Sequence, residues 1–318
     1  MDSDTRKQLL AEIATLYYKE KKTQSQIGRR LGYSRSAISR ILTEAEEQGI
    51  VEITIKYPLS RDANLERRLK EKYHLDAAFV VNSGWTSYAN AQQLVGRMGA
   101  IFLEQSLKDG ITIGIGWGIS ISEVARFLSP MELENVKVVQ VLGSVGGRSD
   151  PRVDGPGVAA NFASKLNARY HILHAPLFLD TEDACTTLKN QKQIAETLNE
   201  GIHCDIALLG IGTVEIDPLY SSIFRSGFLA EEEIRAAMRQ GGLGNFCGMI
   251  LDKEGKILDN EISSRTMAVD LQQLRENCGM VVGIAAGEKK SGAIESVLNG
   301  NWLDVLITDS AAVRPILQ

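Results

Sequence analysis

The chain has 318 residues and a formal net charge of −5, with 44% hydrophobic and 24% charged residues. This length suits a module of about 50 residues joined to one larger domain. No apolar run approaches the ~20 residues that cross a bilayer, and the start lacks a secretory pattern, so we expect a cytoplasmic protein without a membrane partner. The four cysteines lie far apart and the four histidines lack neighbouring ligands, so neither a disulfide framework nor a metal site is expected.

The first predicted element is a helix over residues 6–18. Its apolar residues recur at three- and four-residue intervals, as on the buried face of a helix. We expect this helix to close a three-helix core beneath the two helices that follow. The apolar residues are Leu9, Leu10, Ile13, Leu16 and Tyr17.

Residues 23–51 predict a helix-turn-helix. An amphipathic helix over residues 24–31 is followed by Gly32, which suits a left-handed helix end, and by Ser34, which suits a helix N-cap. A second helix over residues 35–48 buries one apolar face and turns polar side chains near its start away from the core. Such side chains of a recognition helix reach the major groove, where Arg binds guanine. The candidate DNA contacts are Thr23, Gln24, Arg35, Ser36, Ser39 and Arg40.

The charge of this stretch differs from that of the whole chain. Between Lys19 and Arg40 lie seven basic residues and one acid, Glu20, although the protein is net negative. A basic patch on an acidic chain predicts a polyanionic partner for that patch. The alternative is a small helical domain with a solvated basic face.

The residues from Leu16 to Ile53 also carry a family resemblance. The stretch LYYKEKKTQSQIGRRLGYSRSAISRILTEAEEQGIVEI resembles the N-terminal domain of the SorC family of sugar-responsive bacterial transcriptional regulators. A YY pair, a TQ-x-x-I-x-x-x-LG turn and an SR-x-x-x-SR-x-L recognition helix recur in that family. The resemblance implies operator DNA as a partner, and it extends through the C-terminal half of the chain.

Three further segments follow the second helix of this module. Residues 51–57 alternate apolar and polar positions and predict the strand of a wing, although a plain edge strand has the same pattern. Residues 58–64 form a polar linker. A helix over residues 65–73 has a narrow apolar stripe, which suits pairing with another subunit as well as packing on its own domain. We expect a winged helix-turn-helix at residues 1–57, a linker and oligomerisation helix at 58–75 and an effector domain at 76–318.

From residue 77 onward, short apolar runs alternate with helical segments. Continuous apolar strands separated by helices predict a parallel sheet covered on both faces. We expect an α/β fold of the doubly wound, Rossmann-like type. The predicted strands are residues 77–81, 111–116, 136–142, 172–177, 204–210, 247–251, 280–286 and 303–308.

Ligands of such sheets bind beyond the carboxyl ends of the strands, so the loops that follow strands form the candidate effector site. The glycine-rich turn at residues 114–120 can present backbone N–H groups and a helix N-terminus to a phosphate. It lacks the G-x-G-x-x-G spacing of a dinucleotide site, which favours a lone phosphate or sugar phosphate and no nucleotide cofactor. A tight turn without a ligand is the alternative. Glycine-rich loops at residues 143–148, 210–213 and 287–290 follow other strands, and Lys290 can supply a positive charge.

The family resemblance adds detail to this site. GIGWGIS, ALLGIGT, RQGGLGNFCGMILDKEG and AAGEKKSGAI are similar to motifs of the SorC-type effector domain, which binds a phosphorylated sugar or polyol. The resemblance implies that the first motif contacts the phosphate and that Lys290 contacts charged or hydroxyl groups. The chain departs from the family pattern at Ile119, where a hydroxyl residue is usual, and at Asn245, where an aspartate is usual. Leu142 stands where some relatives carry a Schiff-base lysine, which disfavours a covalent effector. The candidate effector contacts are Gly116, Trp117, Gly118, Ser120, Ser144, Gly212, Asn245 and Lys290.

Two other functions suit parts of the sequence less well. A sugar-phosphate isomerase or deaminase needs a carboxylate or histidine poised in the pocket. Its candidates, Asp252, Glu288 and Asp309, lie in a turn, beside a lysine and at a helix start, where structural roles suffice. A DNA-binding architectural protein without a ligand leaves the glycine-rich loops unexplained.

We therefore predict a non-enzymatic regulator of a carbohydrate-utilisation operon, whose operator affinity or assembly responds to a sugar, polyol or sugar phosphate. Successive major grooves lie about 34–36 Å apart, so two recognition helices must be held together and we expect a homo-oligomer. The family resemblance points to dimers that pair into tetramers.

Overall fold

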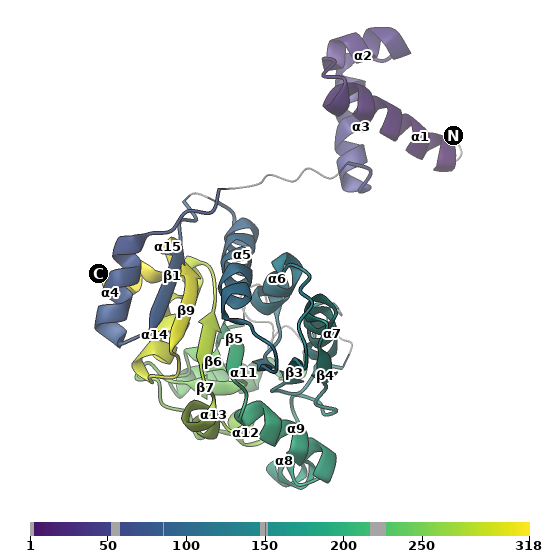
Figure 1. Cartoon of the computed structure of the whole chain (residues 1–318). Helices are drawn as coiled ribbons and strands as arrows, with labels where there is room; N and C mark the ends of the chain where they lie inside the picture. The colour runs from purple at the N-terminus through teal and green to yellow at the C-terminus, as the bar shows by residue number, and fades with distance from the viewer. Residues whose placement is uncertain (1–2, 52–57, 85, 147–149, 151, 217–226) are drawn as a thin grey trace. The chain divides into compact units, whose positions relative to one another are not determined.

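The computed structural model describes residues 3–51, 58–84, 86–146, 150, 152–216 and 227–318 (Figure 1). The chain divides into two compact units, Met1–Pro58 and Leu59–Gln318. No described helix is long and apolar enough to cross a membrane. The boundary assigns the helix predicted at residues 65–73 to the second unit.

The first unit is a bundle of helices. α1 (Ser3–Ala14) continues into a π-helical segment (Thr15–Lys19), so the first predicted helix begins and ends close to its expected bounds. α2 (Gln24–Leu31) and α3 (Arg35–Glu47) follow. The predicted helix-turn-helix is confirmed.

Local capping sets the ends of α2 and α3. The hydroxyl of Thr23 accepts a hydrogen bond from the backbone N–H of Gln26, and that of Ser34 accepts one from Ala37. Gly32 ends α2 in the left-handed conformation, with a φ of 76°. Each of these signals lies within three residues of the helix end that it fixes, which explains why the sequence predicts these bounds well.

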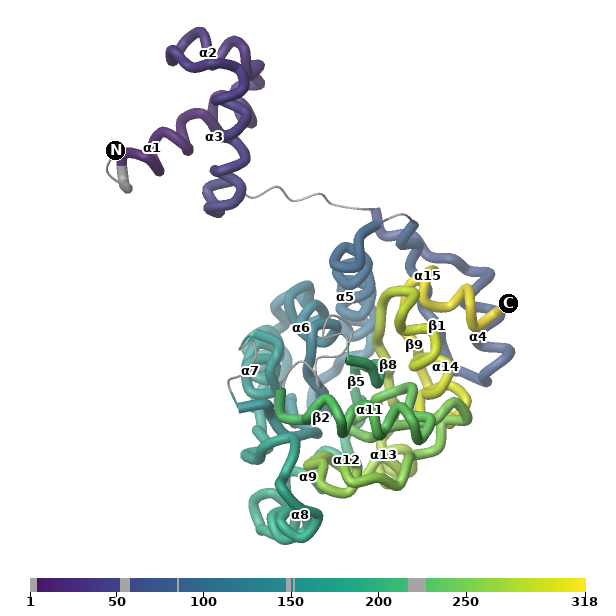
Figure 2. The backbone as a smooth tube through the Cα atoms, turned by 180° about the vertical axis from the view of Figure 1, so that it is seen from behind, coloured from purple at the N-terminus to yellow at the C-terminus, as the bar shows by residue number. Residues whose placement is uncertain are grey.

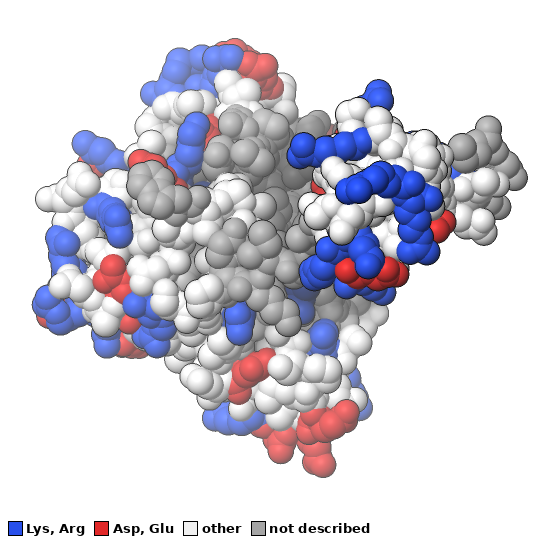
Figure 3. Space-filling view, turned by 90° about the horizontal axis from the view of Figure 1, so that it is seen from above, with Lys and Arg blue, Asp and Glu red and all other residues white. Residues whose placement is uncertain are grey.

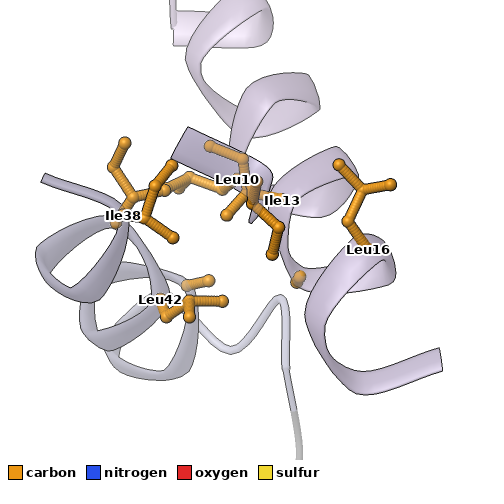
Figure 4. Close-up of a cluster of buried hydrophobic side chains, with 9 residues drawn as sticks. Leu10, Ile13, Leu16, Ile38 and Leu42 are labelled. Carbon is orange, nitrogen blue, oxygen red and sulfur yellow. The ribbon is translucent and has the colours of Figure 1, made fainter. Parts of the chain in front are cut away.

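The helices of the first unit enclose a small apolar core (Figure 4). Gly28 lets α2 approach the turn before α3 closely, because a Cβ at this position would lie 2.5 Å from the carbonyl oxygen of Tyr33. An ion pair between Arg6 and Glu44 joins α1 to α3, with 3.1 Å between Nε and Oε1. Residues 52–57, where most of the wing is predicted, lie outside the described residues. The buried side chains of the core are Leu10, Ile13, Ala14, Leu16, Ile27, Ile38, Ile41, Leu42 and Ala45.

The second unit is built on one large sheet. Its described strands are β1 (Ala77–Val81), β2 (Thr112–Ile115), β3 (Lys137–Gln140), β4 (Arg169–His171), β5 (Ile206–Thr213), β6 (Gly244–Phe246), β7 (Met249–Leu251), β8 (Val281–Ile284) and β9 (Val305–Asp309). The parallel strands lie in the order β1-β9-β8-β5-β2-β3-β4, and the antiparallel strands β6 and β7 extend the end of β5.

Helices cover both faces of this sheet. The described helices are α4 (Ala63–Tyr73), α5 (Tyr88–Ser106), α6 (Ile119–Phe127), α7 (Gly155–Leu166), α8 (Glu182–Lys189), α9 (Lys192–Ile202), α11 (Glu231–Arg239), α12 (Glu261–Ser264), α13 (Leu271–Asn277), α14 (Ser291–Asn299) and α15 (Ser310–Val313), with 3-10 turns at Glu288–Lys290 and Pro315–Leu317. α5, α6 and α7 pack in a row (Figures 1 and 2). β1 packs against α5 and α4, β5 against α6 and α14, and β3 against α7 and α9, so each of these strands meets one helix from each layer. The doubly wound α/β fold is confirmed.

The sheet changes its winding direction between β2 and β5. From β2 the chain proceeds through β3 to β4 at one edge, whereas from β5 it proceeds through β8 to β9 on the other side. In open α/β sheets, the crevice outside the carboxyl ends of two such strands is where ligands bind. Gly116 directly follows β2 and Gly212 lies near the end of β5, so two of the predicted loops flank this switch point.

One predicted strand is absent from the sheet. Residues 172–177 follow the short edge strand β4 and form a loop, which touches the loop after β3 at a single bridge between Ser144 and Pro176. Pro176 has no N–H to donate, so a regular ladder cannot continue through it. Leu173 and Leu177 are buried, and this explains why the segment is apolar without being a strand.

A hairpin replaces another predicted strand. Residues 247–251 contribute only β7, because Cys247 and Gly248 form a tight turn between β6 and β7, with φ values of 49° and 81°. Turns with two left-handed residues are the usual two-residue hairpin connections, but their sequence signal is Asn-Gly or Asp-Gly. Cys-Gly does not carry that signal, so the sequence pattern does not predict β6.

The helix predicted for oligomerisation packs on its own unit. Leu65 and Leu69 of α4 are buried, and α4 packs against β1. Near the end of α4, Arg68 and Lys72 donate hydrogen bonds to backbone carbonyls of the 3-10 turn Pro315–Leu317. Of the two roles left open by the sequence, the structure shows packing within the unit, and the apolar stripe is not free to pair with another subunit.

Candidate functional site

The candidate DNA contacts lie together on one surface of the first unit. Arg35, Ser36, Ser39 and Arg40 are exposed on the first half of α3, and Gln24 at the start of α2 lines a hollow with them. A polar hollow at the start of a recognition helix can receive base edges and phosphates. The structure therefore brings together the side chains that spacing and resemblance selected.

Thr23 has a different role from its neighbours. Its backbone N–H donates to Oε1 of Gln26 at 2.9 Å, and its hydroxyl accepts from the backbone N–H of Gln26 at 3.3 Å. This reciprocal capping box fixes the start of α2. Thr23 is exposed, so a contact with DNA stays a prediction beside the capping role that the structure shows.

Basic side chains gather over the first unit (Figure 3). Within the described part of the chain, Arg35 and Arg40 form no ion pair, whereas Arg6 pairs with Glu44 in the same unit. An unpaired, exposed guanidinium can bind a base or a phosphate without first losing a protein partner. Further exposed basic residues of this unit are Lys19, Lys21, Lys22, Arg29 and Arg30.

A small pocket lies at the switch point between β2 and β5. Its volume is about 30 Å³, which is room for one water molecule or one methyl group. The pocket is therefore too small to enclose a whole sugar, and we regard it as the floor of a larger site. Gly116, Trp117 and Asn245 meet at this pocket although they come from distant segments. The walls are Gly116, Trp117, Leu142, Leu209, Gly210, Asn245, Cys247 and Gly248.

The turn after β2 uses several of its donors within the fold. The N–H of Gly116 donates to a carbonyl of β5 at 3.0 Å, and that of Gly118 donates to the carbonyl of Val153 at 2.9 Å. The indole N–H of Trp117 donates to the carbonyl of Gly143 at 2.8 Å, and the ring is buried. These three N–H groups have partners within the fold, so a contact between Gly116, Trp117 or Gly118 and a phosphate stays a prediction.

Donors that remain at this turn include those of the first turn of α6. Gly118 is the N-cap residue, with a φ of 114°, and α6 has no side-chain cap. The first N–H groups of a helix have no partner inside the helix, so those of Ile119 and Ser120 can meet an anion. Ser120 is half-buried and adds a hydroxyl at the same place.

The loop after β3 is anchored by two residues that the sequence analysis did not select. Buried Gln140 donates from Nε2 to the hydroxyl of Ser144 at 3.0 Å. Oδ1 of Asp154 accepts from the N–H groups of Val145 and Gly155, at 3.1 and 2.9 Å, and so links this loop to the start of α7. An aspartate just before Gly-Pro at a helix start is a recognisable N-cap signal, and it could have identified Asp154.

Gly212 and Asn245 lie opposite each other on β5 and β6. Asn245 is 4% exposed, lines the pocket, and its side-chain amide forms no hydrogen bond with another described residue. Because Asn245 lines the pocket and its amide has no partner among the described residues, this amide is well placed to bind a ligand. A neutral amide can both donate and accept, whereas an ionised aspartate at this place only accepts.

Lys290 is buried near the end of β5. It is 6% exposed, and its Nζ donates to the carbonyl of Ile211 at 2.9 Å. Burial lowers the pKa of Lys290 to about 8, although the negative charge of Glu215 acts in the opposite direction. Lys290 does not line the small pocket, but an anion bound beside it would offset the cost of burying its charge.

Two of the three carboxylates weighed for an enzyme accept hydrogen bonds within the fold. Asp252 accepts a backbone N–H of its own turn. Asp309 is fully buried and makes no capping bond; it accepts from the hydroxyl of Ser83 and the N–H of Gly287, both at 2.7 Å. Glu288 is exposed, and none of the three carboxylates lines the switch-point pocket.

The two-unit organisation has counterparts among known proteins. Residues 57–318 match the family model Sugar-bind, a sugar-binding domain, and residues 7–55 match a model of the MarR family. The chain is 32% identical over 315 residues to the deoxyribonucleoside regulator of Bacillus subtilis, and this match covers 98% of each chain. It is 29% identical to the sorbitol operon regulator of Klebsiella pneumoniae, with 98% of each chain covered. The crystal structure of the full-length regulator SorC from Klebsiella pneumoniae is similar, with a TM-score of 0.73 at 28% identity, covering 99% of this chain and 100% of that chain.

These similarities run along the whole chain and include both units. The relatives are named as transcriptional regulators, so the enzyme alternative finds no support and the helix-turn-helix marks a DNA-binding regulator. The chain belongs to the SorC family of sugar-responsive bacterial transcriptional regulators.

Proposed function

We propose that this protein controls a carbohydrate-utilisation operon in the cytoplasm by binding operator DNA through the first unit and a sugar, polyol or sugar phosphate through the second. The observation that carries the proposal is the pocket at the switch point, where separate loops meet around the buried amide of Asn245. Two relatives, a deoxyribonucleoside regulator and a sorbitol operon regulator, carry names that support the same class of small hydroxylated effector.

The polar groups near this pocket suit an effector whose two ends differ in chemistry. Asn245 on the floor can bond a hydroxyl or carbonyl group of the effector. An anionic end suits the first turn of α6 with Ser120, and Lys290 adds a positive charge on the side of β5. Ser144 from the loop after β3 and Gly212 near the end of β5 complete the proposed contacts.

A path of packed elements supports control of the DNA-binding unit by the effector. The turn Glu288–Lys290 leads directly into α14, and α14 packs against the turn Pro315–Leu317. That turn accepts hydrogen bonds from Arg68 and Lys72 of α4, the first helix of the second unit. An effector that shifts Lys290 can thereby change the position of α4. If the protein exists in two conformations that differ in DNA affinity, the effector changes that affinity only to the extent that it binds one conformation more tightly than the other.

We also propose that the protein acts as a homo-oligomer, a dimer or a tetramer. Two recognition helices separated by about 34–36 Å are needed to meet successive major grooves. Because Leu65 and Leu69 of α4 are buried, the proposed subunit contact uses another surface than this apolar stripe. Light scattering at micromolar concentration should give the mass of an oligomer with and without DNA, and a monomer in both states would refute this part of the proposal.

Thermal unfolding with a panel of sugars, polyols and their phosphates tests the effector assignment. A ligand at 100 times its dissociation constant adds about 2.7 kcal/mol to the state that binds it, so a true effector raises the melting temperature of the second unit clearly. The matched variant Asn245→Ala should lose most of this shift. A panel in which no compound stabilises the wild-type protein would contradict the proposed effector class.

A further inference from the structure

Two of the four cysteines lie side by side at the amino ends of β5 and β8. The Sγ atoms of Cys204 and Cys278 are 3.5 Å apart. Cys204 is buried just before β5, whereas Cys278 is half-exposed at the end of α13. The pair lies at the opposite end of these strands from Gly212 and Lys290, so the effector site does not use it.

The backbone holds the two thiols together. The N–H of Gly279 donates to the carbonyl of Cys204 at 3.1 Å, and a Cβ on Gly279 would lie 2.6 Å from the carbonyl oxygen of Asp205. Only glycine after Cys278 permits this close approach. A disulfide has an S–S length of about 2.05 Å, so the sulfur atoms need to move together by about 1.5 Å.

The two thiols differ in reactivity. The hydrogen bond from Cys204 lowers the pKa of Cys278, whereas the same bond and burial raise the pKa of Cys204. The more exposed thiol is therefore the better nucleophile, and the buried one is placed to react with it afterwards. By contrast, burial raises the pKa of Cys185, and it raises that of Cys247 to about 12.

We propose that Cys204 and Cys278 form a reversible intramolecular disulfide when the protein meets a hydroperoxide. Cys278 first releases its proton, its thiolate attacks one peroxide oxygen and the O–O bond breaks. The leaving oxygen takes up a proton from solvent, so the products are a sulfenic acid on Cys278 and water or an alcohol. The thiol of Cys204 then attacks this sulfur, an S–S bond forms, and water leaves with the proton of Cys204. In total, the two thiols lose two electrons and two protons, and the peroxide is reduced.

The bond would restrain the part of the second unit that carries the pocket floor. Cys204 and Cys278 are 74 residues apart in sequence, and the chain between them includes Asn245 and the β6–β7 hairpin. A cross-link across a long loop restricts the unfolded chain. The oxidised protein should therefore melt at a higher temperature, by about 5 °C or more, and a thiol reductant should reverse the shift.

Peptide mass spectrometry after treatment with hydrogen peroxide tests the proposal. The full-length protein is reduced, desalted, exposed to a small molar excess of hydrogen peroxide and digested without reductant. We expect a peptide linked through Cys204 and Cys278, a loss of two free thiols per chain, and recovery of both after dithiothreitol. Cys185→Ser should behave as the wild type, because it removes a buried thiol outside the pair.

The variant Cys278→Ser should lose both the linked peptide and the thermal shift, and since Cys278 is half-exposed, this substitution should leave the fold intact. If that variant unfolds, the presence or absence of the linked peptide in the digest of the wild-type protein still tests the proposal. Stepwise oxidation of Cys278 to sulfinic acid, with Cys204 still a free thiol, would overturn the proposal. Cross-links between chains in place of the internal bond would overturn it as well.

Discussion

The two units present their candidate sites to solvent in opposite ways. Arg35 and Arg40 stand exposed on α3 and form no ion pair within the described residues, whereas Asn245 and Lys290 are only 4% and 6% exposed. Exposed charges attract a polyanion over a distance that salt shortens. Burying a polar group costs free energy because the group loses its hydration, and contacts with a ligand can offset that cost. Substitutions of Arg35 and Arg40 should therefore change binding without changing stability, and substitutions of Asn245 and Lys290 should change both.

The largest expected effect comes from Lys290→Met, which removes a buried charge at similar length. Burial holds the pKa of Lys290 at about 8, below its ordinary value of 10.5, so folding at pH 7 carries the cost of burying the charged amine. We expect the variant to be more stable than the wild type at pH 7, by up to about 3 kcal/mol. Urea unfolding at pH 7 measures the difference.

The pH dependence of this effect has a defined sign. Between pH 8 and pH 10.5 the unfolded chain keeps the proton on Lys290 that the folded chain has lost, so wild-type stability rises with pH in this window. The advantage of Lys290→Met should shrink as the pH rises towards 10.5. The matched control is Lys108→Met, which removes a charge from an exposed side chain and should not stabilise the protein at pH 7. A Lys290→Met protein that is less stable at pH 7 would mean that the bonds of Lys290, such as that to Ile211, outweigh the burial cost.

The next effect concerns Arg35 and Arg40. Arg35→Ala or Arg40→Ala should cost about 1–3 kcal/mol on the cognate operator and relax the preference at one base pair, while the melting temperature stays unchanged. Lys21→Ala and Lys22→Ala should weaken all DNA sequences alike and reduce the salt slope of binding. Fluorescence anisotropy with an operator selected from a random pool, beside scrambled DNA, separates the two cases. Equal losses on both DNAs for the arginine variants would show that Arg35 and Arg40 bind the backbone.

The contrast between the units also explains what the sequence could predict. In the first unit, Gly32 and Ser34 act on helix ends within three residues of themselves, so the sequence predicts the end of α2 and the start of α3. Hydrophobic periodicity then identified the buried face, including Ile38. The remaining side chains of α3 must then point outward, which explains why the candidate DNA contacts lie next to one another in space.

In the second unit, hydrogen bonds between segments far apart in the sequence decide which polar groups remain available to a ligand. The sequence predicted the α/β class and the loops after the strands, but it could not show that the N–H of Gly116 bonds to β5 or that Lys290 turns inward to Ile211. Both depend on the order of strands, which the chain order does not reveal. The same is true of β6, which exists only because β5 extends beyond the sheet to pair with it.

The smallest effect is expected from Thr23→Ala. Loss of the side-chain half of the capping box should destabilise the first unit by about 1 kcal/mol. If Thr23 only caps α2, operator affinity should change no more than this loss of stability implies. Parallel measurement of unfolding and anisotropy distinguishes the roles, because a loss of affinity without a loss of stability would assign Thr23 to the DNA contacts.

The central claim is that a ligand of the second unit controls DNA binding by the first. Operator affinity should be measured by anisotropy with and without the compound that most stabilises the protein, and affinity for that compound by calorimetry with and without operator DNA. Linkage requires both affinities to change by the same factor, and a coupling of 1–3 kcal/mol corresponds to roughly 5–150-fold. We predict equal factors in the two experiments. Operator affinity that does not change at saturating compound would contradict the account.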